Sequence, residues 1–315
     1  MSNLTFNELM NDYKPSMRHR GGQTSNISVP LSHFVKNACS IDAYKNIGTG
    51  SRSCFTLEQL KRIASSYNKK YPNNKIIYNS STRKDDLWNA IQQKLSNKCN
   101  DTEWCWLDQT FLKTDKDNHN LEKQFKPRGP KKINDWLSTS DIDDAMKLYE
   151  QFFPSFRFFG PVPIDFHGLN TELLELKIAR LYKEGKHYIG IIFNLDPHYK
   201  SGSHWVAMYV DIPKGGIYYY DSYAVCDLPK EIKKLKNSLI KNMTEFHKSI
   251  GSDVKVHYDC NTYRHQYKNS ECGVFSMYFI LEMLRGRTFK SVTSNIIIDD
   301  EIRQMRQVYF RPKYN

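Results

Sequence analysis

Residues 272–284 read CGVFSMYFILEML and are apolar almost throughout, which constrains the fold more than any other stretch of the chain. A helix that is apolar all round has to be buried on every side. The stretch is too short for a membrane span, which needs about 20 apolar residues. Gly286 follows it where the C-terminal cap of a helix belongs. We therefore expect a helix at the centre of a globular core that the remaining chain has to enclose.

The preceding segments supply candidates for the enclosing layers. Short apolar runs at 188–195, 205–210, 217–220 and 254–258 are typical of buried strands. Residues 229–249 instead repeat apolar side chains at helical spacing, in one core-facing stripe made of Ile232, Leu235, Leu239, Met243 and Phe246. Strands and helices that alternate irregularly favour an α+β fold over a doubly wound sheet.

A polar, basic segment interrupts the chain and ends in Lys126-Pro127-Arg128-Gly129-Pro130-Lys131-Lys132. Its two prolines and its glycine exclude a helix there. After it, Ser140 is a suitable N-cap for a helix over 141–152, and residues 171–184 also have helical spacing. We expect four parts: a flexible arm at 1–30, a mainly helical accessory domain at 31–112, a linker at 113–132 and a second domain at 133–315.

Most of the net charge of +12 lies in the front part, where residues 1–132 hold 22 Lys and Arg against 12 Asp and Glu. Within it, residues 54–98 contain two helical patterns around a polar connector and resemble a SAP-like nucleic-acid-binding module. A basic face of that kind could hold phosphates. The more common role of such a stretch is a helical hairpin that packs on another domain or meets protein partners. The run Trp104-Cys105-Trp106-Leu107 is expected in a core or as an interdomain anchor.

The seven cysteines are Cys39, Cys54, Cys99, Cys105, Cys226, Cys260 and Cys272. Their odd number and irregular spacing argue against a disulfide framework and favour a reducing compartment. The absence of a C-x-x-C pair gives a structural zinc site little support. The first residues lack the basic-then-apolar order of a signal peptide, so we expect an intracellular protein.

Three polar segments carry candidate catalytic residues: Gly202-Ser203-His204-Trp205 at a strand start, Asp221-Ser222 at a strand end, and Gln266–Gly273 at a helix start. A helix N-terminus favours the thiolate of a cysteine such as Cys272. His204 could take the proton of that thiol, and Asp221 could orient the imidazole.

An acyl-transfer site also needs donors for the developing oxyanion. The amide of Gln266 and the backbone N–H of Cys272 are the candidates. Each residue alone is more often structural, since a free cysteine usually behaves as a small hydrophobe and an aspartate after a strand usually forms a turn. The combination of a base, an orienting acid, an amide and a thiol in this order favours a cysteine nucleophile.

In that order the chain resembles the SUMO-specific and adenovirus-type cysteine proteases over residues 134–290. The matching pieces are His204-Trp205, Asp221, Gln266 and Cys272-Gly273. The resemblance implies an α+β, adenovirus/SUMO-protease-like cysteine protease core at 133–315, preceded by the mainly helical accessory domain. Residues 136–142 and 160–166 are similar to the polyprotein-processing proteases of large cytoplasmic DNA viruses.

Enzymes of this kind cut after Gly-Gly or Ala-Gly in structural precursors during virion maturation. The resemblance therefore implies viral polyprotein substrates, His204, Asp221 and Cys272 as catalytic residues, and Gln266 in the oxyanion hole. It implies a narrow substrate channel at Trp205 and Gly273, no cofactor and no metal. Residues 1–132 are expected to contact nucleic acid or scaffold, and the protein is expected in the host cytoplasm and the virion.

Three other functions fit the same residues. An isopeptidase that removes SUMO or ubiquitin from host proteins would use identical chemistry on a different substrate. An acetyltransferase is the second, because a related branch uses a similar triad. The third is a nucleic-acid or scaffold protein on an inactive protease fold, which the intact set of His204, Asp221, Gln266 and Cys272 argues against.

Overall fold

The computed structural model describes residues 38–40, 43, 52–113, 118–169 and 172–312. Its internal contacts divide the chain into two units, of which one comprises 33–128 with 309–315 and the other contains 129–308. The arm expected at 1–30 lies outside the described residues. In the described part, no helix combines the length and the apolar character that crossing a membrane requires.

The first unit is helical, with α4 Leu57–Lys70, α5 Lys84–Cys99, α6 Glu103–Trp106, α7 Thr110–Lys113 and α8 Asn118–Glu122. α4 begins at a capping box, in which Thr56 and Gln59 each bind the backbone N–H of the other. Trp106 is fully buried and stacks on Phe55 with ring centroids 6.2 Å apart. The tryptophan run therefore contributes to the core of this unit.

Residues 113–132 were expected to be a linker, but most of this segment belongs to the helical unit. It contributes α8, and Leu121 and Phe125 are buried in the unit's core. The end of the chain joins the same unit: the Arg311 backbone N–H donates to Pro127 O over 2.9 Å, and its guanidinium lies 2.6 Å from Glu122 Oε1. Proline excludes a helix but not burial, so the helical unit extends to Arg128 rather than to 112, and the boundary between the units falls inside the segment 113–132.

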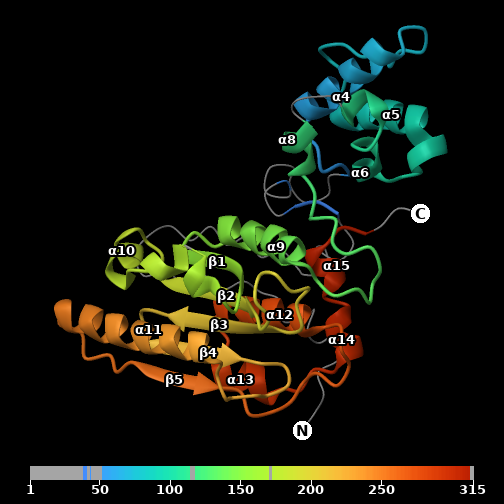
Figure 1. Cartoon of the computed structure of the whole chain (residues 1–315). Coiled ribbons are helices and arrows are strands. Elements are labelled where there is room, and N and C mark those ends of the chain that lie inside the picture. Colours follow the sequence, from blue (N-terminus) through green and yellow to red (C-terminus); the bar gives the residue numbers. More distant parts are fainter. Residues whose placement is uncertain (1–37, 41–42, 44–51, 114–117, 170–171, 313–315) are drawn as a thin grey trace. The chain divides into compact units, whose positions relative to one another are not determined.

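The second unit is built on a five-stranded sheet in the order β1-β2-β3-β4-β5 (Figure 1). The strands are β1 Phe156–Pro163, β2 Tyr188–Asn194, β3 Trp205–Asp211, β4 Gly216–Tyr220 and β5 His257–Cys260. β2, β3 and β4 are antiparallel neighbours, whereas β1 and β5 pair parallel to the strands beside them. Loops of ten residues (195–204) and four residues (212–215) therefore join the three central strands, and crossovers that contain helices reach the two edges.

Helices cover both faces of this sheet. The unit contains α9 Thr139–Phe152, α10 Ile178–Lys183, α11 Lys230–Ser249, α12 Cys272–Leu284, α13 Phe289–Ser294 and α14 Asp299–Arg303, and α15 spans Arg306–Tyr309. α10 and the stripe of α11 pack with Ile189, Ile191 and Phe193 on one face. α12 lies against β3 on the other face, where Phe279 stacks on Tyr220 with centroids 4.8 Å apart. The α+β class and the buried central helix are confirmed.

Four local expectations differ from the structure. Ser138, not Ser140, caps α9, because it forms a capping box with Asp141. The helix expected at 171–184 is a 3-10 turn at Glu172–Glu175 followed by the short α10. β1 was not predicted, and β5 begins at His257, later than the apolar run.

The expectation of unpaired cysteines is wrong. The structure contains the disulfides Cys39–Cys54, Cys99–Cys105 and Cys226–Cys260, which leave Cys272 as the free thiol among the seven cysteines. The paired Cα atoms are 5.2, 5.4 and 5.9 Å apart, inside the range that a disulfide spans. Such proximity arises from tertiary folding, so irregular spacing along the chain did not reveal it.

Candidate active site

His204 stands immediately before β3, the central strand of the sheet, and is held at the start of that strand by its pairing with β2. Its carbonyl accepts from Leu195 N over 2.9 Å, which extends the β2–β3 ladder by one bond. The ring is largely buried, with 9% of the residue exposed. The imidazole is thus held by regular backbone structure rather than by a free loop.

Asp221 follows β4, the antiparallel neighbour of β3, so the end of one strand lies beside the start of the other. Its Oδ1 is 2.7 Å from Nε2 of His204 and also accepts the backbone N–H of Tyr223 over 2.8 Å. Asn261 clamps the backbone of the aspartate, accepting from Asp221 N at 2.9 Å and donating to Asp221 O at 2.7 Å. Asp221 is therefore fixed through both its backbone and its carboxylate.

Cys272 is the first residue of α12 and is buried. Its thiol interacts with the imidazole of His204 and contributes to the raised pKa of that ring. Nε2 of the ring faces Asp221. The unpaired N–H groups and the dipole of the helix N-terminus favour negative charge on the thiol.

The protonation of His204 is shifted strongly by these neighbours. Burial alone would lower its pKa, but the hydrogen bonds and charges of Asp221 and Cys272 outweigh burial and raise the pKa to about 9. Tyr223 stacks on the ring with centroids 4.6 Å apart and covers one of its faces. At neutral pH His204 therefore favours its protonated imidazolium form.

Gln266 is fully buried, and its side chain has a fixed direction. The hydroxyl of Ser222 donates to Gln266 Oε1 over 2.6 Å, and Gln266 Nε2 donates to Lys268 O over 2.7 Å. One hydrogen of the amide is thus used inside the loop that leads to Cys272. The second hydrogen on Nε2 is the one that can serve an oxyanion.

Comparison with known proteins gives a family. The Ulp1 protease family, C-terminal catalytic domain, matches residues 183–315. The chain is also 34% identical over 277 residues, 83% of its length and 90% of the relative, to a protein of Acanthamoeba polyphaga mimivirus that is named as a thiol protease. This chain belongs to the Ulp1 family of cysteine proteases. The expected family and enzyme class are confirmed.

The same Ulp1-type fold occurs in a second viral relative. The SUMO-1 cysteine protease of African swine fever virus is 24% identical over 206 residues, 61% of this chain and 73% of the relative. The crystal structure of the protease from that virus superposes with a TM-score of 0.59 and 22% identity, covering 76% of this chain and 95% of that one. The expected protease-like fold is thereby confirmed.

In this Ulp1-family protease, Trp205 and Gly273 form a tightly packed wall. The indole N–H of Trp205 donates to Leu137 O over 2.9 Å. A Cβ on Gly273 would lie 3.2 Å from Leu137 and 3.3 Å from Trp205, closer than almost all real side-chain contacts. Gly273 is buried, so its first requirement is the close approach of these two neighbours. Substrate contact by both residues remains a prediction.

A pocket of about 500 Å³ opens beside Trp205. Its lining residues include Trp136, Leu137, Asn194 and His198. His204, Asp221 and Cys272 are not among the described residues that line it. Trp205 lines this cavity and directly follows the candidate base His204 in the sequence. The cavity is large enough for several small residues.

Sequence reasoning missed three polar residues that hold this site together. Ser222 orients the amide of Gln266, Asn261 binds both backbone groups of Asp221, and the buried Glu271 precedes Cys272. Ser222 could have been found, because it directly follows the candidate acid. Asn261 carried no local signal, since its partner lies 40 residues earlier in the chain.

Proposed function

We propose that this cysteine protease hydrolyses peptide bonds with Cys272 as nucleophile, His204 as base and acid, and Asp221 as the residue that orients the imidazole. The single observation that carries this proposal is the position of His204, whose Nε2 contacts the Asp221 carboxylate and whose pKa is raised by Asp221 and by the Cys272 thiol. That arrangement makes a thiolate and holds its proton nearby.

In the first step, the thiolate attacks the carbonyl carbon and the electron pair moves onto the carbonyl oxygen. Nε2–H of Gln266 and the backbone N–H of Cys272 stabilise this oxyanion. The His204 imidazolium then gives its proton to the leaving amine, and a thioester remains on Cys272. Water, deprotonated by His204, attacks the thioester, releases the acid and restores the thiolate.

We further propose that the enzyme cuts after Gly-Gly-type sites in viral structural polyproteins during virion maturation. The crowding of Gly273 against Leu137 and Trp205 supports this specificity, because bulky side chains would be excluded near that wall. The host cytoplasm and the virion are the proposed locations. Three disulfides are compatible with a released virion, since disulfides persist where cellular reductants do not act.

A second candidate is removal of SUMO or ubiquitin from host conjugates. The name of the African swine fever virus relative, SUMO-1 cysteine protease, favours it. Both activities would use the same triad and the same preference for glycine. They differ in whether recognition depends on a short sequence or on the folded modifier.

A direct comparison of substrates tests these proposals. The full chain and its Cys272→Ala variant are incubated with a Gly-Gly-Xaa peptide, an Ala-Ala-Xaa peptide and a SUMO–fluorophore conjugate. The leading proposal expects cleavage of the Gly-Gly peptide with a kcat/KM at least about tenfold above that for Ala-Ala, as exclusion of one or two methyl groups permits. Preference for the SUMO conjugate over both peptides would favour the second candidate.

We also propose that residues 1–132 direct the protease to nucleic acid or scaffold, as their 22 basic against 12 acidic residues suggest. Basic surfaces attract polyanions in a salt-dependent way. DNA binding by the inactive Cys272→Ala chain, measured by fluorescence anisotropy at several salt concentrations, tests this role. Binding that is absent at low salt would contradict it.

A further inference from the structure

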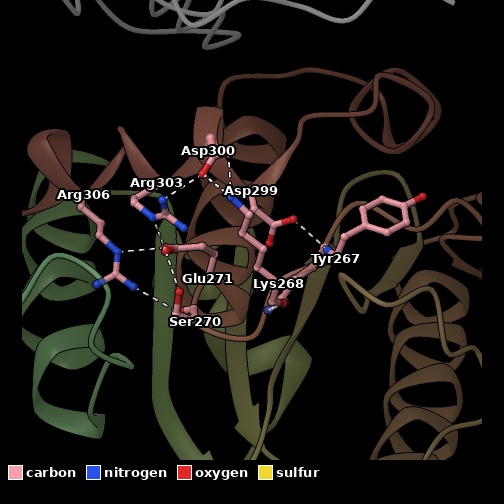
Figure 2. Close-up of polar contacts among 9 residues, drawn as sticks. Tyr267, Lys268, Ser270, Glu271, Asp299, Asp300, Arg303 and Arg306 are labelled. Carbon is pink, nitrogen blue, oxygen red and sulfur yellow. Dashed lines mark hydrogen bonds and ion pairs between the residues drawn. The ribbon is translucent and has the colours of Figure 1, made fainter.

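The loop that joins Gln266 to Cys272 is tied along most of its length to the segment Asp299–Arg306, which contains α14 and the start of α15 (Figure 2). The candidate oxyanion amide and the candidate nucleophile stand at the two ends of this loop. Hydrogen bonds and ion pairs from that segment reach most of the residues between them: Tyr267, Lys268, Ser270 and Glu271. The spacing between the two ends therefore depends on what holds the loop.

Glu271 is the strongest of these anchors. It directly precedes Cys272 and is completely buried. Its Oε1 lies 2.9 Å from Nε of Arg303 and its Oε2 lies 2.9 Å from Nε of Arg306, so each oxygen has its own guanidinium (Figure 2). Arg306 is itself buried and also donates to Ser270 O over 3.0 Å. Charge-assisted bonds of this kind fix direction as well as distance.

The other end of the loop is held by the acidic residues of α14. Asp299 Oδ2 accepts the backbone N–H of Tyr267 over 2.8 Å. Lys268 Nζ lies 2.7 Å from Asp300, which is 2.9 Å from Arg303. The carbonyl of Lys268 is the acceptor for Gln266 Nε2, so this anchor acts on the direction of the amide.

Glu271 occupies the N-cap position of α12, but its side chain makes no cap hydrogen bond. Its carboxylate points into the two arginines instead. A buried carboxylate next to a thiolate is costly unless its charge is compensated. Arg303 and Arg306 supply that compensation, and the same bonds fix the position of the residue that directly precedes the nucleophile.

We propose that Glu271, Arg303 and Arg306 are positioning residues that set the separation between the Cys272 sulfur and the oxyanion donors. This inference rests on the function proposed above. The α14–α15 segment acts on catalysis through the loop and does not touch the substrate. A small displacement of the loop separates nucleophile from donors, and a misplacement of about 1 Å can cost roughly 10²-fold in rate.

Glu271→Gln is the informative variant, because charge and position predict opposite results for it. The substitution removes a negative charge beside the thiol, so an electrostatic effect alone would make the thiolate more favourable and turnover no slower. A positioning role predicts that kcat falls by at least about tenfold while KM stays within about threefold, since only the transition state needs the oxyanion geometry.

A second readout separates positioning from loss of fold. Alkylation of Cys272 by iodoacetamide needs a nucleophilic thiol but no oxyanion donor. We expect its rate in Glu271→Gln to stay within about threefold of the parent rate while kcat falls, and Glu271→Asp to recover part of kcat. A parallel fall of alkylation and kcat, in proportion to the folded fraction, would overturn the proposal.

α12 supplies a matched control at its opposite end. Glu282 is also buried, and it also binds two arginines, Arg285 and Arg287. It lies eleven residues beyond Glu271, which is roughly 16 Å along the helix. Glu282→Gln should lower the melting temperature about as much as Glu271→Gln and leave kcat/KM within about twofold for the folded protein.

The outcomes are distinguishable. Equal kcat in the two glutamine variants, or an unchanged kcat in Glu271→Gln, would overturn the positioning role. Full activity of Cys272→Ala would instead overturn the proposed function, whatever Glu271→Gln does. Loss of kcat in Glu271→Gln alone, with alkylation retained, would support both.

Discussion

The hydroxyl of Ser222 donates to Oε1 of Gln266 over 2.6 Å and thereby determines which end of that amide can face a substrate. Without this bond, the donation from Gln266 Nε2 to Lys268 O would be the remaining side-chain contact that holds the amide in this orientation. The backbone reinforces the contact, because Gln266 N also donates to Ser222 O over 2.9 Å. The residue after the candidate acid thus controls the candidate oxyanion donor.

Ser222→Ala should lower kcat by roughly tenfold, less than the 10²–10³-fold expected for Gln266→Ala, because the amide would keep its donor but lose one of the two bonds that fix its direction. Steady-state kinetics on the Gly-Gly-Xaa peptide measures both. Ser249→Ala is the control, since that hydroxyl only binds Phe246 O within α11. A change confined to KM in Ser222→Ala would assign Gln266 to substrate binding.

Cys272→Ala and His204→Ala should each reduce kcat/KM by roughly 10³-fold or more with little change in the far-ultraviolet circular dichroism, because only the imidazole-paired thiolate attacks. Asp221→Asn should be milder, since it disturbs the orientation of the imidazole and removes no reacting atom. Peptide hydrolysis with matched active-site concentrations checks this order. Cys272→Ala within tenfold of the parent would refute the assignment.

The raised pKa of His204, about 9, predicts the alkaline limit of the enzyme. Below that pH the imidazolium keeps the proton that the leaving amine needs, and above it the proton is lost. kcat/KM should therefore fall with a midpoint near pH 9, and Asp221→Asn should move that midpoint to lower pH. A midpoint that does not move would remove Asp221 from this role.

The same shift contributes to stability with a defined sign. The folded pKa of His204 lies above its usual value of 6.5, so the folded protein binds the proton more tightly than the unfolded chain does. The stabilisation is complete below pH 6.5 and is lost as the pH rises through about 9. Urea unfolding of the parent and His204→Ala across this range should show a difference that shrinks with rising pH.

Gly273→Ala should lower the free energy of unfolding by about 1–3 kcal/mol, because the added methyl group overpacks a rigid site. Its neighbours are Leu137 and Trp205 at 3.2 and 3.3 Å, and the indole is held by its bond to Leu137 O. Urea denaturation measures the change. Gly168→Ala is the control, since a Cβ there meets nothing within 4 Å; an equal loss in both would argue against crowding.

The sequence predicts the centre of the protease unit well. The buried α12 and the strands β2, β3 and β4 are continuous apolar runs, α11 has a periodic apolar stripe, and each appears where it was expected. β1 was missed because its sequence, FRFFGPVP, contains Gly160-Pro161, which usually marks a turn. The strand tolerates that pair at an irregularity in its register with β2, between Phe158 and Pro161.

The candidate site was only partly predictable. His204, Asp221 and Cys272 carry local signals, since each stands at the end of a periodic segment. The contacts of Glu271 could not be predicted, because Arg303 and Arg306 lie 32 and 35 residues later and follow a stretch without clear periodicity. Buried ion pairs between distant segments are set by the packing of the whole unit, which no local pattern encodes.

The pairing of six cysteines has a practical meaning for counting enzyme molecules. Cys272 is the thiol that the three disulfides leave unbonded. A thiol-directed probe applied to the oxidised protein should therefore attach at a stoichiometry of one label per chain. The label would report on the sulfur proposed to attack the substrate, so the fraction of labelled chains becomes a titration of competent catalyst in any preparation.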